Sequence, residues 1–471
     1  MNLSTFPPTN PSMPRTLHIV LVTETWLPDI NGVASSLFYL MQSLKQAGHR
    51  ITLVMPEPLA PVLNHSVFYQ SPTMAMSNSV IDDIITVKAL PIPYYSHLRM
   101  GLPNKRMLHQ TFADIKPDIV HIATEGPLGW VALKVAKKLK IHVCSGYHTS
   151  FDDFSRHFGG RLLPSAWLAT AIMHYLKYFH NGCDATCVPS EKTLRQLQQQ
   201  GIKNLHLVGR GINKQLFCSD KRSQMLRQSW QAGEETTVLL YVGRVSPEKG
   251  IDTVIQGFKA LQHQQLYRHV KLVIVGDGPA KAPLMQKYQL ANANPYAPHD
   301  PQDINIIFTG FQTGDDLAMH YASADAFIFA SQVETFGNVV VEAMASGLPV
   351  FAYKDAAAAM LVDTSCGDTV AVGQENAFID MVANLPKLQQ LHAMRATAEQ
   401  KVADFSWQTP ANAMLAMFYQ VLGCNPTVEN LSVLNVTAEP MAVPQPKFLP
   451  ALPKNLLTKP LTHPLNKPLV Q

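Results

Sequence analysis

Two glutamates, eight positions apart, have the type and spacing to bind a phosphorylated sugar. Glu334 and Glu342 bracket a Thr-Phe-Gly-Asn-Val-Val-Val segment that follows the apolar run 326–329, and a helix is expected over 338–346. The free N–H groups of a helix N-terminus attract phosphate, and a carboxylate on either side can accept hydrogen bonds from two hydroxyls. The alternative is that both glutamates are solvated surface residues. The candidate ligand contacts of this segment are Glu334, Phe336, Gly337, Asn338, Val339 and Glu342.

A basic loop, residues 243–250, follows the apolar run 238–242. It places Arg244 and Lys249 at the carboxyl end of an expected strand. Two cations there could clamp a diphosphate and offset the negative charge on a departing phosphate. A solvated basic loop would have the same composition.

A glycine-rich turn follows the next expected strand, residues 270–275. It contains Gly276, Gly278 and Pro279, and its Gly-x-Gly start invites a dinucleotide interpretation. The sixth position of that motif should be glycine but is Lys281, so the pattern fails. We therefore predict a tight turn that lets a nucleoside approach the backbone.

The first half of the chain offers two further candidates. Gly32 precedes a helical pattern over 33–47 and could let the backbone approach a phosphate or sugar, although a plain turn glycine is equally compatible. His148 follows the expected strand 142–145. Ligands bind at the carboxyl ends of parallel strands, so we expect its imidazole at the edge of a cleft. A purely structural histidine is the alternative.

These candidates are carried by two repeats of the same element order. Strands are expected at 17–22, 51–55, 119–122 and 142–145, and again at 238–242, 270–275, 304–308, 326–329 and 349–352. Helical patterns such as 33–47 and 252–261 separate them, which indicates parallel sheets. The fold class is therefore α/β, with two doubly wound units joined near 201–213 and a ligand site in the cleft between them. The polar, proline-containing segment 291–303 is expected to be an exposed loop.

Composition excludes several classes of protein. The chain has 471 residues, more than one core usually serves, with 46% hydrophobic and 15% charged residues, so it is not disordered overall. A formal charge of +4 does not indicate a nucleic-acid binder. No apolar run could span a bilayer, and the first 14 residues lack a signal-type core. The 6 cysteines lack metal-ligand spacing and suggest free thiols in a reducing cytoplasm.

Two segments suggest contact with an anionic membrane surface. Residues 154–182 contain Arg156, Arg161, Lys177 and several aromatic residues without any acidic residue, with a helix expected over 164–179. Residues 98–110 add Arg99, Lys105 and Arg106, again without an acid. Cations beside aromatic anchors are typical of interfacial helices, although an ordinary core helix with a solvated edge is the alternative.

Taken together, the motifs resemble the retaining glycosyltransferases of family 4, which have the GT-B fold. The resemblance rests on Glu334-x7-Glu342, the Gly-Arg-x-x-x-x-Lys-Gly loop, the Gly-Asp-Gly-Pro turn and the His148-Thr149 pair, and it runs from about residue 17 to 422. Segments 147–151, 209–213, 345–349 and 353–359 narrow it to a branch with bacterial GDP-mannose-dependent α-mannosyltransferases and glycolipid-forming sulfoquinovosyl- and glucosyltransferases. Asn31-Gly32 in place of Gly-Gly, Asn213 in place of Asp, and an insertion at 291–303 depart from the family pattern.

The resemblance implies a role for each candidate residue. Arg244 and Lys249 would bind the donor diphosphate, Glu334 and His148 the transferred sugar, and Glu342 the ribose. The turn at 276–279 would lie by the nucleoside and Gly32 by the phosphates. The family mechanism is a front-face transfer with retention, without a metal or another cofactor, and a helix near 410–422 would cross back to the first domain and allow closure.

We therefore expect a cytoplasmic transferase, peripheral on the inner membrane face, that moves mannose from GDP-mannose to a lipid or lipid-linked acceptor. A UDP-glucose or UDP-sulfoquinovose glycolipid synthase, or a family 4 enzyme with a soluble acceptor, is the alternative. An epimerase, a nicotinamide dehydrogenase and an inactive nucleotide-sugar sensor fit the motifs less well. The expected divisions are a disordered segment 1–14, Rossmann-like domains 15–205 and 206–400, the crossing helix 401–424, and a proline-rich tail 425–471.

Overall fold

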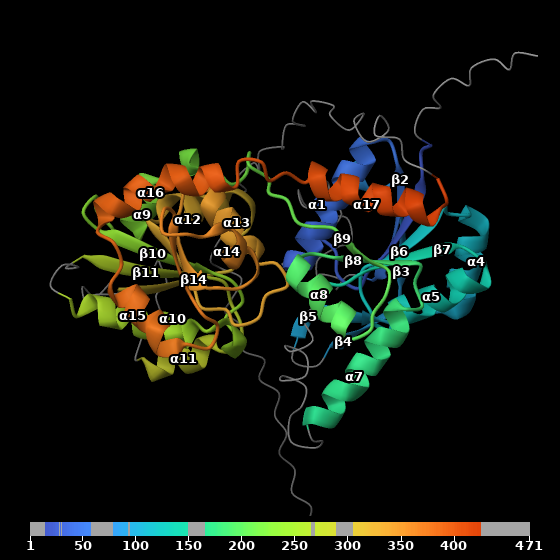
Figure 1. The fold of residues 1–471 in the computed structure, drawn as a ribbon, viewed down its shortest axis with the longest axis horizontal. Coiled ribbons are helices and arrows are strands. Elements are labelled where there is room, and N and C mark those ends of the chain that lie inside the picture. Colours follow the sequence, from blue (N-terminus) through green and yellow to red (C-terminus); the bar gives the residue numbers. More distant parts are fainter. Residues whose placement is uncertain are drawn as a thin grey trace, which may run out of the picture.

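Two parallel β-sheets, one in each half of the chain, form the framework of the protein. The computed structural model describes residues 15–27, 29, 31–57, 79–92, 95–148, 165–264, 269–288 and 305–424. Each sheet has helices on both faces, and the two units lie side by side (Figure 1). The expected segments 1–14, 291–303 and 425–471 lie outside the described residues, as does the part of segment 154–182 up to residue 164.

The first sheet has the strand order β3-β2-β1-β6-β7-β8-β9. All six of its strand pairings are parallel. The strands are β1 (His18–Val22), β2 (Arg50–Pro56), β3 (Asp83–Val87), β6 (Ile119–Ile122), β7 (His142–Gly146), β8 (Ala185–Val188) and β9 (Leu205–Leu207). The surrounding helices are α1 (Gly32–Gln46), α4 (Lys105–Ile115), α5 (Pro127–Lys138), α7 (Ser165–His180) and α8 (Glu191–Gln199). Strands such as β6 are buried along their whole length, as expected for a sheet covered on both faces.

The second sheet has the order β12-β11-β10-β13-β14-β15, again with only parallel pairings. Its strands are β10 (Thr237–Val242), β11 (Val270–Val275), β12 (Ile306–Gly310), β13 (Ala326–Phe329), β14 (Val350–Tyr353) and β15 (Gly367–Val370). Its helices are α9 (Gln224–Ser229), α10 (Ile251–Gln262), α11 (Lys281–Lys287), α12 (Gly314–Ser323), α13 (Asn338–Ala345), α14 (Ala356–Leu361), α15 (Glu375–Ala383) and α16 (Leu388–Lys401). Short 3-10 turns η1 (Ser219–Lys221) and η2 (Pro247–Lys249) lie in its loops.

Both sheets reverse their strand order at one point, between β1 and β6 and between β10 and β13. Such switch points leave a crevice at the carboxyl ends of the two central strands, where doubly wound folds bind ligands. The doubly wound α/β fold predicted from the sequence is confirmed. The topology therefore directs attention to the loops that follow β1, β6, β10 and β13.

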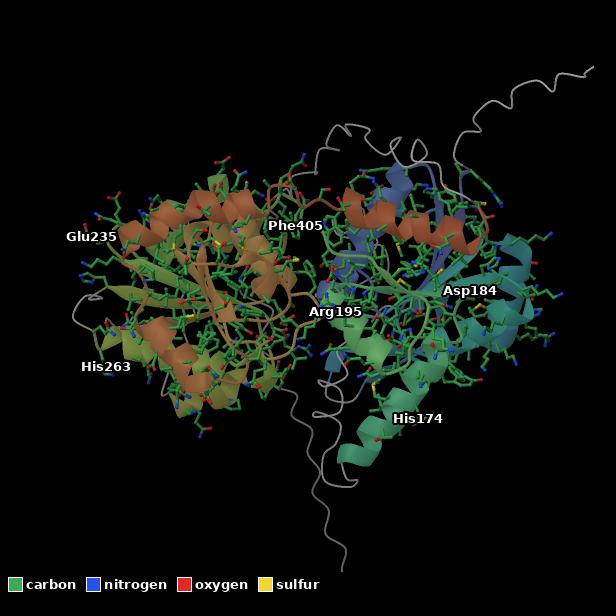
Figure 2. All side chains as sticks on the ribbon, viewed as in Figure 1. His174, Asp184, Arg195, Glu235, His263 and Phe405 are labelled. Atoms are coloured by element: carbon green, nitrogen blue, oxygen red, sulfur yellow. The ribbon has the colours of Figure 1, made fainter. Side chains whose placement is uncertain are left out.

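The last described helix, α17 (Gln408–Val421), belongs to the first unit although it follows the second along the chain (Figure 1). Met414 and Phe418 are buried in the core that covers one face of the first sheet. Trp407, just before the helix, stacks on Tyr39 of α1 with ring centroids 5.4 Å apart. Phe405 marks the return crossing between the units in Figure 2.

One region differs from the expectation of a basic interfacial segment at 98–110. Residues 98–101 belong to β5 (Tyr95–Gly101), which pairs antiparallel with β4 (Ala89–Ile92), and only 105–110 are helical, in α4. The Arg99 guanidinium donates to the carbonyl oxygens of Glu57 and Ala89 at 2.6 and 2.8 Å. Arg99 therefore holds two backbone segments together and is not placed as a free surface cation.

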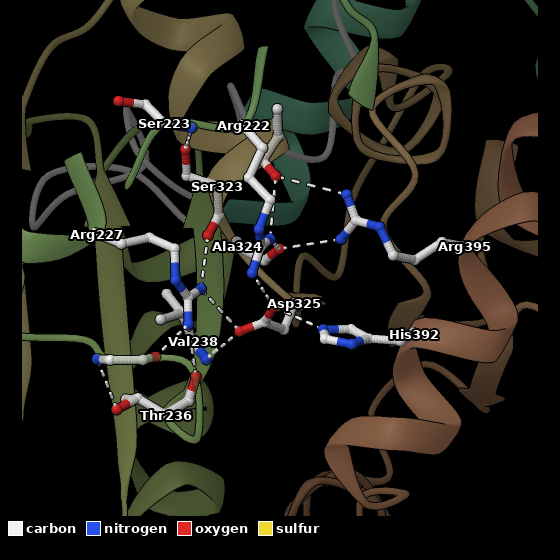
Figure 3. Close-up of polar contacts among 12 residues, drawn as sticks. Arg222, Ser223, Arg227, Thr236, Val238, Ser323, Ala324, Asp325, His392 and Arg395 are labelled. Atoms are coloured by element: carbon white, nitrogen blue, oxygen red, sulfur yellow. Dashed lines mark hydrogen bonds and ion pairs between the residues drawn. The ribbon is translucent and has the colours of Figure 1, made fainter. Parts of the chain in front are cut away.

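A buried carboxylate connects the amino-terminal end of the second sheet to the surrounding helices (Figure 3). Asp325, directly before β13, is fully buried and accepts from Arg227, Arg222 and the Val238 N–H at 3.0, 2.9 and 2.8 Å. His392 of α16 lies 3.3 Å away. These partners hold the pKa of Asp325 at about 2, although burial opposes that shift. The network lies at the opposite end of the strands from the carboxyl-end loops.

The cysteines are all free thiols. Cys144, Cys183, Cys187 and Cys366 are buried, and Cys218 and Cys424 are partly so. Burial raises the pKa of Cys183 and Cys187 to about 12, so these thiols are neutral and unreactive at physiological pH. They serve as small core side chains.

Candidate active site

The switch point of the second sheet brings the two most chemically specific sequence motifs together. Lys249 closes the turn after β10, and Glu334 lies in the loop after β13. The Lys249 ammonium is 2.7 Å from Oε1 of Glu334, and both side chains are largely buried. The same ammonium also reaches Ser331 Oγ at 3.4 Å. Arg244, on the same loop as Lys249, is exposed.

A glycine makes this approach possible. Gly250 follows Lys249 with φ +64°, a conformation that side chains disfavour, and a Cβ built there would lie 2.2 Å from the Ala330 carbonyl oxygen. The loop after β10 can therefore press against the end of β13. This contact sets the position from which Lys249 reaches Glu334.

The glycines at positions 276 and 278 are required by close contacts with the neighbouring backbone. A Cβ on Gly276 would meet the Gly243 carbonyl oxygen at 2.0 Å, and one on Gly278 would meet the Val245 carbonyl oxygen at 2.4 Å. The Cβ position of each glycine is thus taken by protein backbone, which gives a packing reason for both residues, and the approach of a nucleoside to this turn stays a prediction. The turn, closed by Pro279, supports the loop that carries Arg244 through the Val245 N–H, which donates to the Asp277 carbonyl oxygen at 3.0 Å.

The N-terminus of α13 is formed by the segment after Glu334. Phe336 is buried and anchors the segment, while Gly337 takes the left-handed conformation with φ +85° directly before the helix. No side chain caps the helix, so the backbone N–H groups of Asn338 and Val339 are available at its start. This is the geometry that attracts an anionic group.

The start of α1 faces the start of α13 across the two units. The Asn338 amide donates to Ser36 Oγ at 3.1 Å. A Cβ on Gly32 would lie 3.7 Å from the same amide nitrogen, which is ordinary van der Waals distance. Asn31 caps α1 by accepting from the N–H groups of Val33 and Ala34 at 3.1 and 2.9 Å. Two helix N-termini therefore converge where Gly32 was expected to meet phosphate.

Glu342 lies further along α13 and is held by a tyrosine that the sequence patterns did not single out. Tyr321 of α12 donates its hydroxyl to Oε2 of Glu342 at 2.9 Å. Burial raises the pKa of Glu342 to about 7, partly offset by that hydrogen bond. The carboxyl group is therefore only partly ionised near neutral pH, and its oxygens can accept hydrogen bonds from hydroxyls.

His148 lies deeper than expected. We predicted its imidazole at the edge of a cleft, but the residue is only 9% exposed and lines a small cavity inside the first unit. Its Nδ1 is 2.9 Å from Nη2 of Arg210, which lies in the linker between the units. Burial and the neighbouring guanidinium hold the pKa of His148 well below its usual range.

Helix α8 of the first unit touches the second unit beside the Glu334 loop. Ser190, which caps α8, donates from Oγ to the Thr335 carbonyl oxygen at 3.0 Å. Lys192 forms an ion pair with Asp355, which precedes α14. These contacts hold the segment between Glu334 and α13 against the first unit.

The switch point of the first sheet carries a pair of glutamates that motif reasoning missed. Glu24 follows β1 and accepts from the Leu128 N–H at the start of α5 at 3.3 Å, and Glu125 follows β6. Burial, with the nearby Glu125 carboxylate, raises the pKa of Glu24 to about 7. His180 Nε2 lies 3.3 Å from Glu125. Two polar residues after adjacent strands were a usable signal, because carboxyl ends of parallel strands share one edge.

An aromatic surface lies beside these glutamates where α7 packs on α5. Tyr178 is 60% exposed, and the Lys134 ammonium lies 4.7 Å from the Trp130 ring centroid and 5.0 Å from that of Tyr178. Lys177 is exposed on the same helix. Helix α7 projects from the first unit, with His174 on its outer part (Figure 2). Arg156 and Arg161 of the predicted segment fall outside the described residues.

No described helix is both long enough and apolar enough to cross a bilayer. Within the same described ranges, no group of three or more His, Cys, Asp or Glu side chains is placed to hold a metal ion.

Known proteins resemble this chain over most of its described length. Residues 30–216 match the family described as Glycosyltransferase Family 4, and residues 223–401 match Glycosyl transferases group 1. The GDP-mannose-dependent alpha-mannosyltransferase of Mycobacterium tuberculosis is 30% identical over 86% of this chain and 97% of that protein. The alpha-monoglucosyldiacylglycerol synthase of Acholeplasma laidlawii is 28% identical over 72% of this chain and 81% of that protein.

Solved structures agree in fold. Sucrose-phosphate synthase of Thermosynechococcus elongatus superposes with a TM-score of 0.64 at 19% identity, covering 86% of this chain and 99% of that one. At this identity the likeness establishes the fold alone. It is that of two Rossmann-like units, as the motifs predicted.

Proposed function

The chain belongs to glycosyltransferase family 4, as its motifs predicted, and on this premise we propose that it transfers mannose from GDP-mannose to a lipid or lipid-linked acceptor with retention of configuration. The observation that carries the proposal is the Lys249–Glu334 pair beside the uncapped start of α13. It joins a cation for phosphate, a carboxylate for hydroxyls and a helix N-terminus in one place.

In the proposed donor site these groups bind different parts of the nucleotide sugar. Arg244 and Lys249 bind the diphosphate together with the N–H groups at the start of α13, and Gly32 leaves room for a phosphate at the start of α1. Glu334 accepts hydrogen bonds from hydroxyls of the transferred sugar, and Glu342, held by Tyr321, accepts from the ribose. The turn with Gly276, Gly278 and Pro279 supports the Arg244 loop from behind.

The proposed chemistry is a front-face displacement at the anomeric carbon. The bond from that carbon to the donor phosphate oxygen breaks, the acceptor oxygen attacks from the same face, and the departing phosphate takes the acceptor proton. Glu334 is a poor candidate for a covalent nucleophile, because its carboxylate is paired with Lys249. Two cations and a helix N-terminus can stabilise the charge on the departing diphosphate without a metal ion.

Two arguments support a lipid or lipid-linked acceptor. The curated relatives include a diacylglycerol glycosyltransferase as well as mannosyltransferases. Helix α7 carries the exposed Lys177 and Tyr178 and also contacts the glutamate segment, because Tyr175 donates its hydroxyl to the Glu125 carbonyl oxygen. An acceptor in a membrane bound by α7 could therefore present its hydroxyls to Glu24 and Glu125. On this proposal the enzyme works at the inner membrane face from the cytoplasm, held by aromatic and basic residues.

A UDP-glucose or UDP-sulfoquinovose donor for a glycolipid is the second candidate, supported by the glucosyldiacylglycerol synthase relative. A family 4 enzyme with a soluble acceptor is the third. An inactive sensor of nucleotide sugars would have little use for Glu334, whose carboxylate is present and held in place by Lys249.

Thermal unfolding of the purified protein with GDP, UDP, ADP and NAD at equal millimolar concentration tests the donor. A nucleotide present at about 100 times its dissociation constant adds roughly 2.7 kcal/mol of stability, a clear shift of the midpoint. We expect the shift with GDP. A shift with UDP alone would favour the second candidate, and no shift with any nucleoside diphosphate would overturn the donor site.

Transfer is then measured with the GDP-sugar and vesicles that contain diacylglycerol or phosphatidylinositol as acceptors, with soluble sugars in a parallel reaction. The anomeric configuration of the product, read by proton NMR, tests retention. An inverted product would contradict the front-face mechanism.

A further inference from the structure

Arg210 and His148 meet inside the first unit, where the linker between the units passes the carboxyl ends of β7 and β8. Nη2 of Arg210 lies 2.9 Å from Nδ1 of His148. Each residue is 9% exposed, and both line the same small cavity. In the described part of the chain the guanidinium has one other hydrogen bond, to the Gly209 carbonyl oxygen at 3.4 Å, and no carboxylate beside it.

This contact determines which nitrogen of the imidazole carries the proton. A guanidinium has five donors and no acceptor. Burial lowers the pKa of Arg210 only to about 10, so the side chain is still a cation at neutral pH. Nδ1 of His148 must therefore accept the hydrogen bond with its lone pair, which leaves the single ring proton on Nε2.

The surroundings also keep the ring neutral. The groups that face it are Arg210, His121 of β6 and His180 of α7, and each opposes a positive charge on the ring when protonated. Burial lowers the pKa of His121 to about 3, and the Cys187 thiol of β8 stays neutral because burial raises its pKa to about 12. Helices α1 and α17 contribute the uncharged Leu40 and Met414 to the cavity. No described carboxylate counters Arg210 here.

Nε2 of His148 is buried, and no described residue accepts its hydrogen. This position of the ring requires glycine at residue 146, at the end of β7, because a Cβ there would lie 2.4 Å from Nε2. A buried N–H without a partner costs free energy, and such groups are normally satisfied. The described residues therefore leave this N–H for an acceptor atom that enters the small cavity lined by His148.

We propose that Arg210 is a positioning residue for the transfer reaction, one that fixes His148 as its neutral Nε2–H tautomer so that the imidazole offers a single permanent donor to an oxygen of the transferred sugar. The identity of that ligand rests on the proposed function, whereas the tautomer is a property of the protein alone. A ring held in this way binds a hydroxyl or ring oxygen, but it neither takes up nor releases a proton during transfer.

The tautomer is read directly from the ring nitrogens of full-length protein labelled with ¹⁵N-histidine, by two-bond ¹H–¹⁵N correlation spectra from pH 5.5 to 8. His148→Gln assigns the signal. We expect the Nε2–H pattern for His148 without titration across this range. A Nδ1–H pattern, or a protonated ring at pH 7, would overturn the proposal without recourse to any variant of Arg210.

Arg210→Met, Arg210→Lys and the control Arg195→Met, an exposed arginine of α8, test the consequence for catalysis. We expect Arg210→Met to lower kcat roughly 10–100-fold with a smaller change in the donor KM, and to add a limb near the ordinary histidine pKa of about 6.5 to the pH profile. Arg210→Lys should restore part of kcat, and Arg195→Met should leave it unchanged. A kcat profile for Arg210→Met parallel to wild type would refute a positioning role.

The tautomer of His148 and the transfer of a sugar can be tested independently. If the Nε2–H pattern is found but no nucleotide sugar is turned over, the assignment of the tautomer to Arg210 stands and the proposed function falls. If transfer is observed with the Nδ1–H pattern, the function stands and the role of Arg210 falls.

Discussion

The ammonium of Lys249 and the carboxylate of Glu334 form an ion pair, 2.7 Å apart, between loops that follow two neighbouring strands of the second sheet. The pair lets two opposite charges lie largely buried in the unliganded protein, where either alone would be costly. A donor with a diphosphate and a hydroxylated sugar offers each group a new partner of the right charge. The ion pair is therefore a preformed version of the contacts that the substrate would make.

Replacing Glu334 with Gln should separate chemistry from nucleotide binding. The amide keeps the shape but offers weaker acceptors to the sugar hydroxyls, so we expect kcat to fall by about 10²-fold or more. Affinity for the free nucleoside diphosphate, measured by calorimetry, should change less than about threefold. Equal losses in both quantities would argue against a role for Glu334 at the transferred sugar.

Gly32→Ala should weaken nucleotide binding without destabilising the fold, whereas Gly278→Ala should destabilise the fold. A methyl group on Gly32 meets only the Asn338 amide at 3.7 Å, so unfolding free energy should stay within about 0.5 kcal/mol of wild type. Affinity for the nucleoside diphosphate should fall about tenfold, because the methyl group fills the approach of the phosphate. Gly278→Ala places a Cβ 2.4 Å from the Val245 carbonyl oxygen and should cost roughly 2 kcal/mol or more of stability in urea unfolding. Unchanged nucleotide affinity in Gly32→Ala would remove Gly32 from the donor site.

Glu342→Gln should stabilise the protein at alkaline pH while impairing donor binding. Folding raises the pKa of Glu342 to about 7 from 4.5, so the folded state holds the proton more tightly than the unfolded one. The contribution of this group to stability is greatest below pH 4.5 and falls as pH rises to about 7. The variant lacks this titrating group, so its free energy of unfolding should exceed that of wild type by on the order of 1–3 kcal/mol at pH 8. At pH 5 the difference should be much smaller. Urea unfolding at the two pH values checks this, and a variant less stable than wild type at pH 8 would contradict it.

Asp325→Asn should destabilise the second unit, because it leaves the buried Arg227 and the Arg222 guanidinium without their counter-charge. We expect a loss of roughly 3 kcal/mol in urea unfolding, against no measurable change for the exposed Asp220→Asn. The folded pKa of Asp325 is about 2, below the usual 3.8. Its stabilisation is thus present above pH 3.8 and is lost as pH falls toward 2, so the difference between variant and wild type should shrink in acid. A constant difference would mean that the charge is not the cause.

A double variant, Lys177→Glu with Tyr178→Ser, should weaken binding to anionic vesicles. Reversing one charge and removing one exposed ring on α7 should lower the partition coefficient on phosphatidylglycerol-containing vesicles about tenfold or more, as measured by co-sedimentation. Tyr178 contacts Trp130 and Lys134 but is 60% exposed, so the melting temperature should fall by no more than roughly 2–4 °C. Lys387→Glu, an exposed lysine of the second unit, is the charge-matched control. Equal binding by all three proteins would refute anchoring through α7.

The sequence predicted the second unit more completely than the first, for a physical reason. Strands β10 and β11 are each six residues long, with only Thr237 and Lys271 polar, and are buried along their whole length, so composition alone marks them. Strand β8 was not predicted, because it is short and contains the polar Thr186, whose buried hydroxyl has its hydrogen-bond partner, Ser145 Oγ of β7, at 2.9 Å. Such a partner is 41 positions away and leaves no local pattern.

Some residues of the candidate site were predictable from the sequence, and others were not. Lys249, Glu334 and the start of α13 belong to one switch point, and strand and turn signals sufficed to bring them together. Arg210 and Tyr321 were not predicted as site residues, because their roles come from contacts with His148 and Glu342 that depend on tertiary packing. The glycines at 276 and 278 were recognised as special, but the close approach of the Gly243 and Val245 carbonyl oxygens that requires them is a tertiary contact with no local pattern.

The return of α17 to the first unit makes the second unit, in effect, an insertion within the first. Cys187 of β8 and Met417 of α17 pack with their sulfur atoms 3.5 Å apart although 230 positions separate them. During synthesis the first unit must therefore wait, with one face of its sheet uncovered, until the whole second unit has left the ribosome. The half that is made last can thus complete its core before the half that is made first. A single protease cut in either crossing would leave the protein in one piece, and only cuts in both would release the inserted unit.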